Sequence, residues 1–178
     1  GVLLGDGGFT NNAISVSLYE EDIFDRVKSI LEADGFGISL FSKNRPKMKD
    51  YRISDILFNK NTSSLSRKDG TFGNRMMQKI YDLGLLNHKS EDKFIPKCFL
   101  YNSIENRIKL LQGLFDTDGT LNIHYGRHNT KGCSIAYSTS SKQLAEDIVF
   151  LVQSLGGTCT CNEHETFYTY KGEKKRGL

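Results

Sequence analysis

Apolar residues recur at helical spacing in several segments of this 178-residue chain. The clearest series runs from Ile104 to Phe115, where intervals of three and four residues place an apolar stripe along one side of a helix. Ser103 is a suitable N-cap for this helix, which should end near Asp118-Gly119. Similar patterns predict further helices over about Glu20–Ala33, Asn74–Leu83 and Ser141–Leu155.

Short stretches rich in β-branched and aromatic residues lie between these helices. They predict strands at Ile14–Leu18, Gly37–Phe41, Tyr51–Phe58, Leu121–Tyr125, Ser134–Ser138, Thr158–Cys161 and Phe167–Tyr170. The segment Asn59–Gly73 is polar and turn-rich, and it predicts a loop. The resulting order of helix, strands, helix, strands is typical of an α+β fold.

The chain repeats itself, and the repeat divides it into two halves. A shift of 112 positions aligns Gly1–Gly7 with Gly113–Gly119. A second pair of similar segments, which begin at Glu21 and Glu146, is related by a shift of 125 positions. The second copy therefore holds 13 additional residues between the two segments, and duplication predicts halves at residues 1–92 and 93–178.

Small residues occupy corresponding places in the two repeated helices. Gly1 and Gly5 are four positions apart, as are Gly113 and Thr117, so each pair lies on one face of its helix. Small residues on one face allow two helix backbones to approach closely. We therefore expect the two repeated helices to pack against each other.

The residue that follows each pair of small residues is an aspartate, Asp6 or Asp118. Two carboxylates at the ends of close-packed helices repel each other unless a cation lies between them, and hard oxygen ligands suit magnesium. Such a site fits the hydrolysis of phosphodiesters. Either Asp-Gly dipeptide alone also fits an ordinary helix-ending turn, but the duplicated pair favours a site.

These segments resemble a known family. Leu111–Gly119 is similar to the LAGLIDADG signature, and Gly1–Gly7 resembles the last seven positions of a first copy, in the Leu-Gly-Asp-Gly form common in inteins. Lys93–Pro96 and Tyr137–Ala145 resemble blocks of intein-borne homing endonucleases. The resemblance covers nearly the whole chain, without the residues that begin and end a splicing domain.

The resemblance implies two pseudo-symmetric αββαββα halves, with antiparallel DNA-binding sheets and the motif helices packed at the centre. It also implies cleavage of a specific duplex DNA site with Mg²⁺, for which Mn²⁺ is a substitute, by a monomer with internal twofold pseudosymmetry. Asp6 and Asp118 match the catalytic, metal-binding positions, and Gly5 and Thr117 adjoin them in the metal site. Asp116 matches a motif aspartate with a structural role.

Members of this family often carry a lysine near the metals. The positions found by counting from the motifs hold Tyr19 and Ser140, so neither supplies one. Lys142 is close in sequence and is our candidate for this catalytic role, although a solvated helix residue is the alternative interpretation.

The net charge is only +3, but its distribution is uneven. The predicted helix Glu20–Ala33 and the residue after it hold six acidic residues against two basic ones. A nearby segment with one acid, Asp50, supplies five candidate DNA contacts, Lys43, Arg45, Lys47, Lys49 and Arg52. The additional residues of the second half should lengthen a hairpin that enters the major groove, where we expect DNA contacts from His124, Arg127 and Lys131.

Other features of the sequence bear on the location of the protein and on alternative functions. No apolar run approaches the roughly 20 residues of a membrane span, and no secretory signal is visible, so we expect a cytoplasmic or nucleoid-associated location. A zinc site at Cys133, Cys159, Cys161 and His164 is an alternative to reduced thiols. Alternatives to an endonuclease are a DNA-binding or RNA-maturase-like protein without cleavage, and a structural insert.

Overall fold

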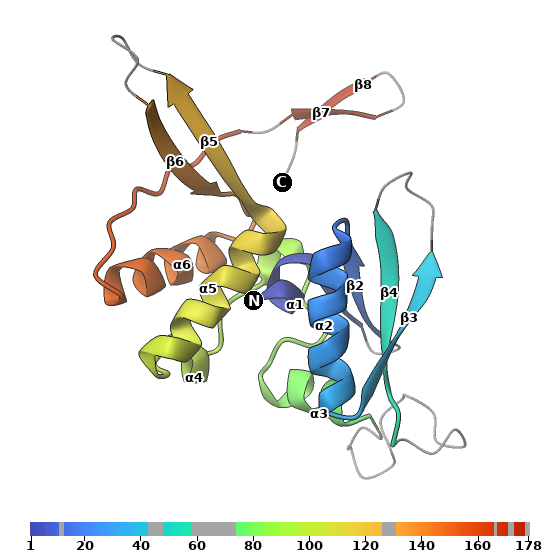
Figure 1. Cartoon of the computed structure of the whole chain (residues 1–178). Coiled ribbons are helices and arrows are strands. Elements are labelled where there is room, and N and C mark those ends of the chain that lie inside the picture. The colour runs from blue at the N-terminus through green and yellow to red at the C-terminus, as the bar shows by residue number, and fades with distance from the viewer. Residues whose placement is uncertain are drawn as a thin grey trace.

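The computed structural model describes residues 1–10, 13–42, 48–57, 74–125, 131–165, 167–170 and 173–176, and it has an α+β architecture with antiparallel strands (Figure 1). The helices are α1 (Val2–Asp6), α2 (Glu21–Ala33), α3 (Arg75–Asp82), α4 (Lys97–Leu100), α5 (Ile104–Asp118) and α6 (Lys142–Ser154), with a 3-10 turn at Ser90–Asp92. The strands are β1 (Gly7–Thr10), β2 (Ala13–Leu18), β3 (Phe36–Ser42), β4 (Lys49–Asp55), β5 (Gly119–Tyr125), β6 (Lys131–Tyr137), β7 (Phe167–Tyr170) and β8 (Glu173–Arg176). None of the described helices is long and apolar enough to cross a membrane.

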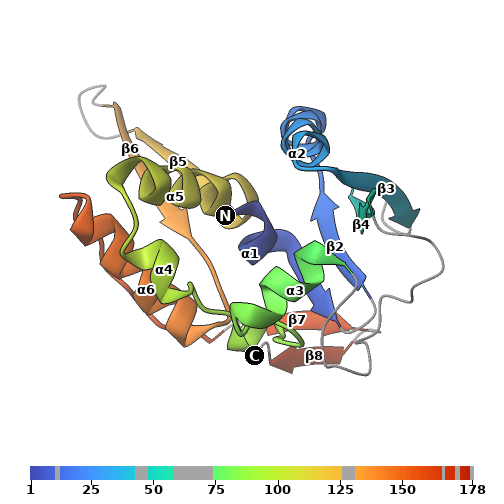
Figure 2. The same ribbon diagram turned by 90° about the horizontal axis from the view of Figure 1, so that it is seen from below.

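Helices α1 and α5 pack directly against each other, and α1 lies between α5 and strand β2 (Figure 2). A Cβ atom added to Gly1 would lie 2.5 Å from the Cα of Gly113, and one added to Gly113 would lie 2.9 Å from the backbone nitrogen of Val2. A Cβ on Gly5 would collide with the hydroxyl of Thr117. The close approach expected from these small residues is confirmed.

The two helices end in the same way. Gly7 follows α1 with φ −83° and ψ 146°, and Gly119 follows α5 with φ −81° and ψ 148°. These are extended conformations that any residue adopts, so the backbone angles do not require glycine. Crowding does: a Cβ on Gly7 would meet the carbonyl of Leu3, and a Cβ on Gly119 would meet the carbonyl of Phe115. Each helix thus passes directly into a strand, β1 or β5.

The first half has the predicted order αββαββα, from α1 to α3. Its strands form one antiparallel sheet with the order β1-β2-β4-β3. Helix α2 lies across one face of this sheet, where Phe24 stacks on Tyr51 with ring centroids 4.5 Å apart (Figure 1). Buried Ile14, Val16 and Ile53 belong to the same core, and the opposite face of the sheet carries small polar residues.

An ion pair between a buried carboxylate and an exposed arginine joins the sheet to α3. The side chain of Asp55, at the end of β4, is 2% exposed and accepts from the Arg75 side chain at 2.9 Å. The hydrogen bonds and charge of Arg75 lower the pKa of the Asp55 carboxyl, although its burial acts in the opposite direction. This pair holds the last helix of the first half against the end of β4.

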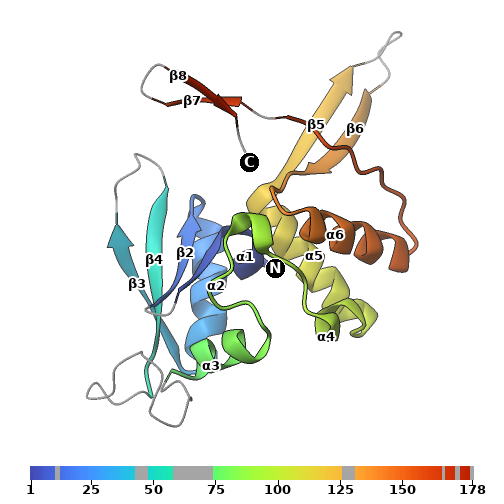
Figure 3. The same cartoon turned by 180° about the vertical axis from the view of Figure 1, so that it is seen from behind.

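The second half follows the order α5, β5, β6, α6, β7, β8, but its strands do not form a single sheet. Strands β5 and β6 form one hairpin, and β7 and β8 form another that lies apart from it (Figure 3). The αββαββα order is therefore confirmed for the first half, whereas the symmetry of the two halves stays a prediction.

Several sequence-based boundaries were wrong. Thr158–Cys161 is exposed and irregular rather than a strand, and none of the described strands pairs with it. Strand β4 begins and ends earlier than expected, and β1, β8 and α4 were not predicted. The loop expected at Asn59–Gly73 lies outside the described residues. The other helices agree with the prediction to within two residues.

The packing of α1 on α5 predicts that Gly113→Ala is destabilising. The added Cβ would lie 2.9 Å from the nitrogen of Val2 and 3.0 Å from the Cα of Gly1, both of them backbone atoms. We expect a loss of about 1–3 kcal/mol in the free energy of unfolding, measured with urea, as for other overpacked sites.

Gly132→Ala is the matched control, because a Cβ on Gly132 has nothing within 4 Å, and we expect little change there. In an open helix, replacing glycine by alanine stabilises by about 1 kcal/mol. A Gly113→Ala protein as stable as the wild type would therefore contradict the close packing.

Candidate active site

The two predicted catalytic aspartates are brought together at the ends of the packed helices. Asp6 is the last residue of α1, and Asp118 is the last residue of α5. A Cβ on Gly5 would lie 2.8 Å from the Oδ2 atom of Asp118, so this carboxylate lies against the end of α1. The charges of both aspartates act on two other side chains, Lys93 and Tyr137.

Lys93 is a buried cation beside these carboxylates. The residue is 5% exposed, and its Nζ donates to the carbonyl of Gly5 at 2.6 Å. Burial lowers the pKa of the Lys93 ammonium, although the negative charges of Asp118 and Asp6 act in the opposite direction. Lys93 is therefore the basic side chain that the fold places at the two carboxylates.

The segment around Lys93 is held by helix α6. The hydroxyl of Ser141, the N-cap of α6, donates to the carbonyl of Lys93 at 2.5 Å. The carboxylate of Asp147, within α6, accepts from the backbone nitrogen of Ile95 at 2.7 Å. Ser141 and Asp147 are buried, so these bonds are shielded from water and hold the lysine in place.

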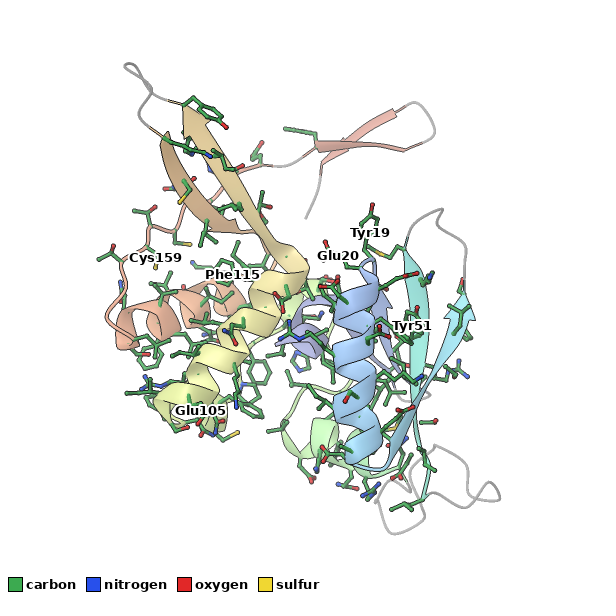
Figure 4. The ribbon with its side chains drawn as sticks, viewed as in Figure 1. Tyr19, Glu20, Tyr51, Glu105, Phe115 and Cys159 are labelled. Atoms are coloured by element: carbon green, nitrogen blue, oxygen red, sulfur yellow. The ribbon has the colours of Figure 1, made fainter. Side chains whose placement is uncertain are left out.

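Tyr137, at the end of β6, contacts the second carboxylate. Its hydroxyl donates to Oδ2 of Asp118 at 3.2 Å, and its ring packs edge-to-face on Phe115 with centroids 5.5 Å apart. Figure 4 shows Phe115 on the side of α5 that faces α6. Burial raises the pKa of the Tyr137 phenol, and the charge of Asp118 adds to the effect, so the phenol is a hydrogen-bond donor.

The donors at this site fit magnesium. Two carboxylates and one ammonium leave a formal negative charge, and Mg²⁺ is commonly held by one or two carboxylates together with water and substrate phosphate. Within the described ranges, no three His, Cys, Asp or Glu side chains form a group that could hold a metal ion. The same finding argues against the zinc alternative, since Cys133, Cys159, Cys161 and His164 are all described and all exposed.

The expected neighbours in the metal site already have partners. The Gly5 carbonyl accepts from Lys93, and the Thr117 hydroxyl donates to the carbonyl of Leu114 at 2.8 Å. The Thr117 hydroxyl also lies 3.4 Å from Oδ2 of Asp118. Gly5 and Thr117 thus border the carboxylates, and their role as metal ligands stays a prediction.

The catalytic role expected of Lys142 stays a prediction. Lys142 is the exposed first residue of α6, whereas the lysine buried at the carboxylates is Lys93. The segment Lys93–Pro96 had been singled out in the sequence, but its lysine was not assigned a role. The motif was therefore visible in the sequence, but only the packing of α6 shows that the Lys93 side chain reaches the site.

Asp116 points away from the paired carboxylates. Its Oδ2 lies 3.9 Å from a guanidinium nitrogen of Arg26 on α2, at the surface. The contact links α5 of the second half to α2 of the first, in keeping with the structural role that the resemblance implies for Asp116.

The basic residues of β4 lie on opposite faces of the first sheet. Lys49 faces α2 and lies 3.3 Å from the carboxylate of Glu21. Arg52 lies on the open face, where its guanidinium is 4.4 Å from the ring centroid of exposed Phe41. Side chains alternate along a strand, so two residues of one basic cluster are separated by the sheet.

The remaining candidate DNA contacts are described only in part. Lys43, Arg45, Lys47 and Arg127 lie outside the described residues. His124 contacts the hydroxyl of Ser134 across the β5–β6 hairpin at 2.8 Å. Lys131 lies 5.9 Å from the ring centroid of Tyr125. The hairpin residues are exposed, and their contact with DNA stays a prediction.

Paired helices that each end in an aspartate, where an antiparallel strand begins, are the arrangement that the resemblance implies. Residues 105–177 match the family described as a LAGLIDADG-like domain. This part of the chain is similar to that family, as the resemblance of its motif predicted.

Two curated proteins are similar to this chain. It is 29% identical over 162 residues to the replicative DNA helicase DnaB of Nostoc sp., a match that covers 90% of this chain and 17% of the helicase. It is 33% identical over 84 residues to the replicative DNA helicase DnaB of Mycobacterium intracellulare, covering 47% of this chain and 12% of the helicase. The chain thus spans less than a fifth of these relatives.

The position of Lys93 predicts a pKa that depends on Asp118. The negative charge of Asp118 favours the ammonium form of Lys93, so Asp118→Asn should lower the pKa of Lys93 further below its ordinary value. An NMR titration of isotopically labelled lysine side chains measures this shift. Asp116→Asn is the control and should leave the pKa of Lys93 unchanged. A rise in that pKa in the Asp118→Asn protein would exclude the charge pairing.

Proposed function

We propose that this chain is a site-specific, magnesium-dependent double-strand DNA endonuclease of the homing type, carried by an intein. The observation that carries the proposal is the pair Asp6 and Asp118 at the ends of two close-packed helices, with the Lys93 ammonium beside them. The match of residues 105–177 to a LAGLIDADG-like domain supports it.

The reaction is the hydrolysis of a phosphodiester in each strand. A water molecule loses a proton and adds to phosphorus, one P–O ester bond breaks, and the departing oxygen takes up a proton. Magnesium, when bound, polarises a phosphoryl oxygen and makes water a stronger nucleophile. Asp6 and Asp118 would hold the cation, each serving one strand of the duplex. The Lys93 ammonium stabilises negative charge that develops on the phosphate.

The open face of the first sheet and the exposed β5–β6 hairpin are the proposed DNA contacts. Arg52 carries a positive charge on that face, with Ser15 and Ser39 beside it on the neighbouring strands. Arginine and hydroxyl side chains bind phosphates and the edges of bases. The acidic helix α2 covers the other face, so the exposed guanidinium of Arg52 favours the open face for DNA, although the carboxylate of Asp50, which accepts from Ser17, lies on that face too.

The comparisons support the intein setting. Both relatives are named as replicative helicases, yet the matches cover only 17% and 12% of their length. A LAGLIDADG-like segment that accounts for so little of a helicase fits an element inserted into a host protein. The DNA target would then be the host gene without the insertion.

A LAGLIDADG protein that binds nucleic acid without cutting it is the main alternative. The absence of a lysine at Tyr19 and Ser140 suggested this alternative from sequence. Lys93 supplies a buried cation at the carboxylates, and it favours the nuclease.

The proposal predicts that Asp6→Asn and Asp118→Asn separate cleavage from binding. Each change keeps the shape of the side chain but removes the charge that holds the cation, so double-strand cleavage should fall by more than roughly 100-fold. Specific DNA binding should persist, because the sheet contacts are unchanged. The measurement is magnesium-dependent cleavage of a plasmid that carries the uninserted host gene, beside a gel-shift titration.

Asp116→Asn is the matched control and should retain cleavage, since Asp116 faces Arg26. Full double-strand cleavage by the Asp118→Asn protein would end the assignment of the active site. Binding without cleavage by the wild-type protein would instead support the alternative function.

The sheet geometry predicts different effects for two basic residues of β4. Arg52→Gln should weaken DNA binding and make the log-log dependence of affinity on salt shallower by about one unit, if it removes one phosphate contact. Lys49→Gln should change neither, because Lys49 faces α2 and pairs with Glu21. Salt titrations of DNA affinity measure both, and equal effects of the two changes would contradict the assignment of faces.

A further inference from the structure

The two aspartates have different neighbours at the same place in the fold. Gly7, which follows Asp6, is paired across β1 and β2 with Val16. Gly119, which follows Asp118, is paired across β5 and β6 with Tyr137. The position opposite the glycine therefore holds valine, whose side chain forms no hydrogen bonds, in the first half. In the second half it holds tyrosine, which carries a phenol.

Tyr137 is held in place from two directions. Its backbone is fixed opposite Gly119 in the hairpin, and its ring is packed edge-to-face on Phe115. The hydroxyl then reaches Oδ2 of Asp118 at 3.2 Å. Val16 is 1% exposed, belongs to the core of the first half and has no group that donates to a carboxylate.

A hydrogen bond from a fixed phenol restricts how a carboxylate rotates. Oδ2 of Asp118 accepts from Tyr137, and the hydroxyl of Thr117 lies 3.4 Å from the same atom. A carboxylate has about four lone-pair sites, so the others remain for a cation. Partners of this kind orient metal ligands, and their loss typically costs about 10–100-fold in metal affinity or activity.

We propose that Tyr137 is a positioning residue for Asp118, and that the two strands of the DNA target consequently depend on it unequally. The inference rests on the proposed endonuclease function, in which each aspartate serves one strand. Without the phenol, the strand served by Asp118 is cut slowly, the strand served by Asp6 is cut at nearly its normal rate, and nicked DNA accumulates.

The test is Tyr137→Phe, which keeps the ring against Phe115 and removes only the hydroxyl. Cleavage of each strand of an end-labelled target is followed separately in magnesium. The ratio of the two single-strand rates should change by about 10–100-fold relative to the wild type. Raising the magnesium concentration should restore the slow strand, because the defect lies in holding the cation.

Tyr101→Phe is the matched control. Tyr101 also packs edge-to-face on a phenylalanine, Phe150, with centroids 5.3 Å apart, but it is 71% exposed and follows α4. The same chemical change there should leave the strand ratio and the magnesium dependence unchanged.

A second measurement is independent of cleavage. Binding of Mn²⁺ to the DNA-free protein, followed by calorimetry, should weaken in the Tyr137→Phe protein and remain unchanged in the Tyr101→Phe protein. Equal slowing of both strands with unchanged Mn²⁺ affinity, or an unchanged strand ratio, would overturn the inference. If the wild-type protein cuts no confirmed target, the proposed function fails, and the Mn²⁺ affinities still decide whether Tyr137 positions Asp118.

Discussion

The close contact between α1 and α5 determines where the chemistry of this protein is placed. Gly1 and Gly113 meet backbone to backbone, and Gly5 lies where any side chain would collide with Thr117. Asp6 and Asp118 are the last residues of these two helices, so the helix contact sets how near the carboxylates lie. A larger residue at any of these glycines would push the two helices apart and would move the carboxylates apart with them. The geometry of the site therefore depends directly on the packing of the helices.

Bringing two carboxylates together costs free energy, and the surroundings offset only part of that cost. Lys93 contributes a positive charge, but its own burial disfavours the ammonium. The lysine reaches the site because Ser141 and Asp147 of α6 hold the segment that carries it. A helix of the second half therefore completes the surroundings of a carboxylate from the first. The charge that remains is negative, which is the condition for attracting a divalent cation and, with it, a phosphate.

The alternation of side chains along β4 separates charges that are neighbours in sequence. Lys49 pairs with Glu21 on the side of α2, whereas Arg52 lies on the open face against Phe41. Strand β3 shifts its register between Leu40 and Ser42, so Phe41 is an additional residue opposite β4 and its ring lies beside the guanidinium. Of the two described basic residues of this segment, Arg52 is thus exposed on the open face and Lys49 binds the covering helix.

Local patterns in the sequence determined the elements that depend on neighbouring residues alone: the helices α2, α5 and α6, most strands, and the small residues that let two helices approach. Helical and strand periodicity, caps and glycine positions act over a few residues, and they are therefore visible in one dimension. The duplicated Asp-Gly also indicated the two candidate ligands, and Lys93 and Tyr137 lay within segments that the sequence had singled out. The placement of these two side chains at the carboxylates, the separation of Lys49 from Arg52, and the division of the second half into two hairpins were decided only by the tertiary structure. Each of these depends on which surface of one element meets another, and that is set by packing between residues far apart in the chain.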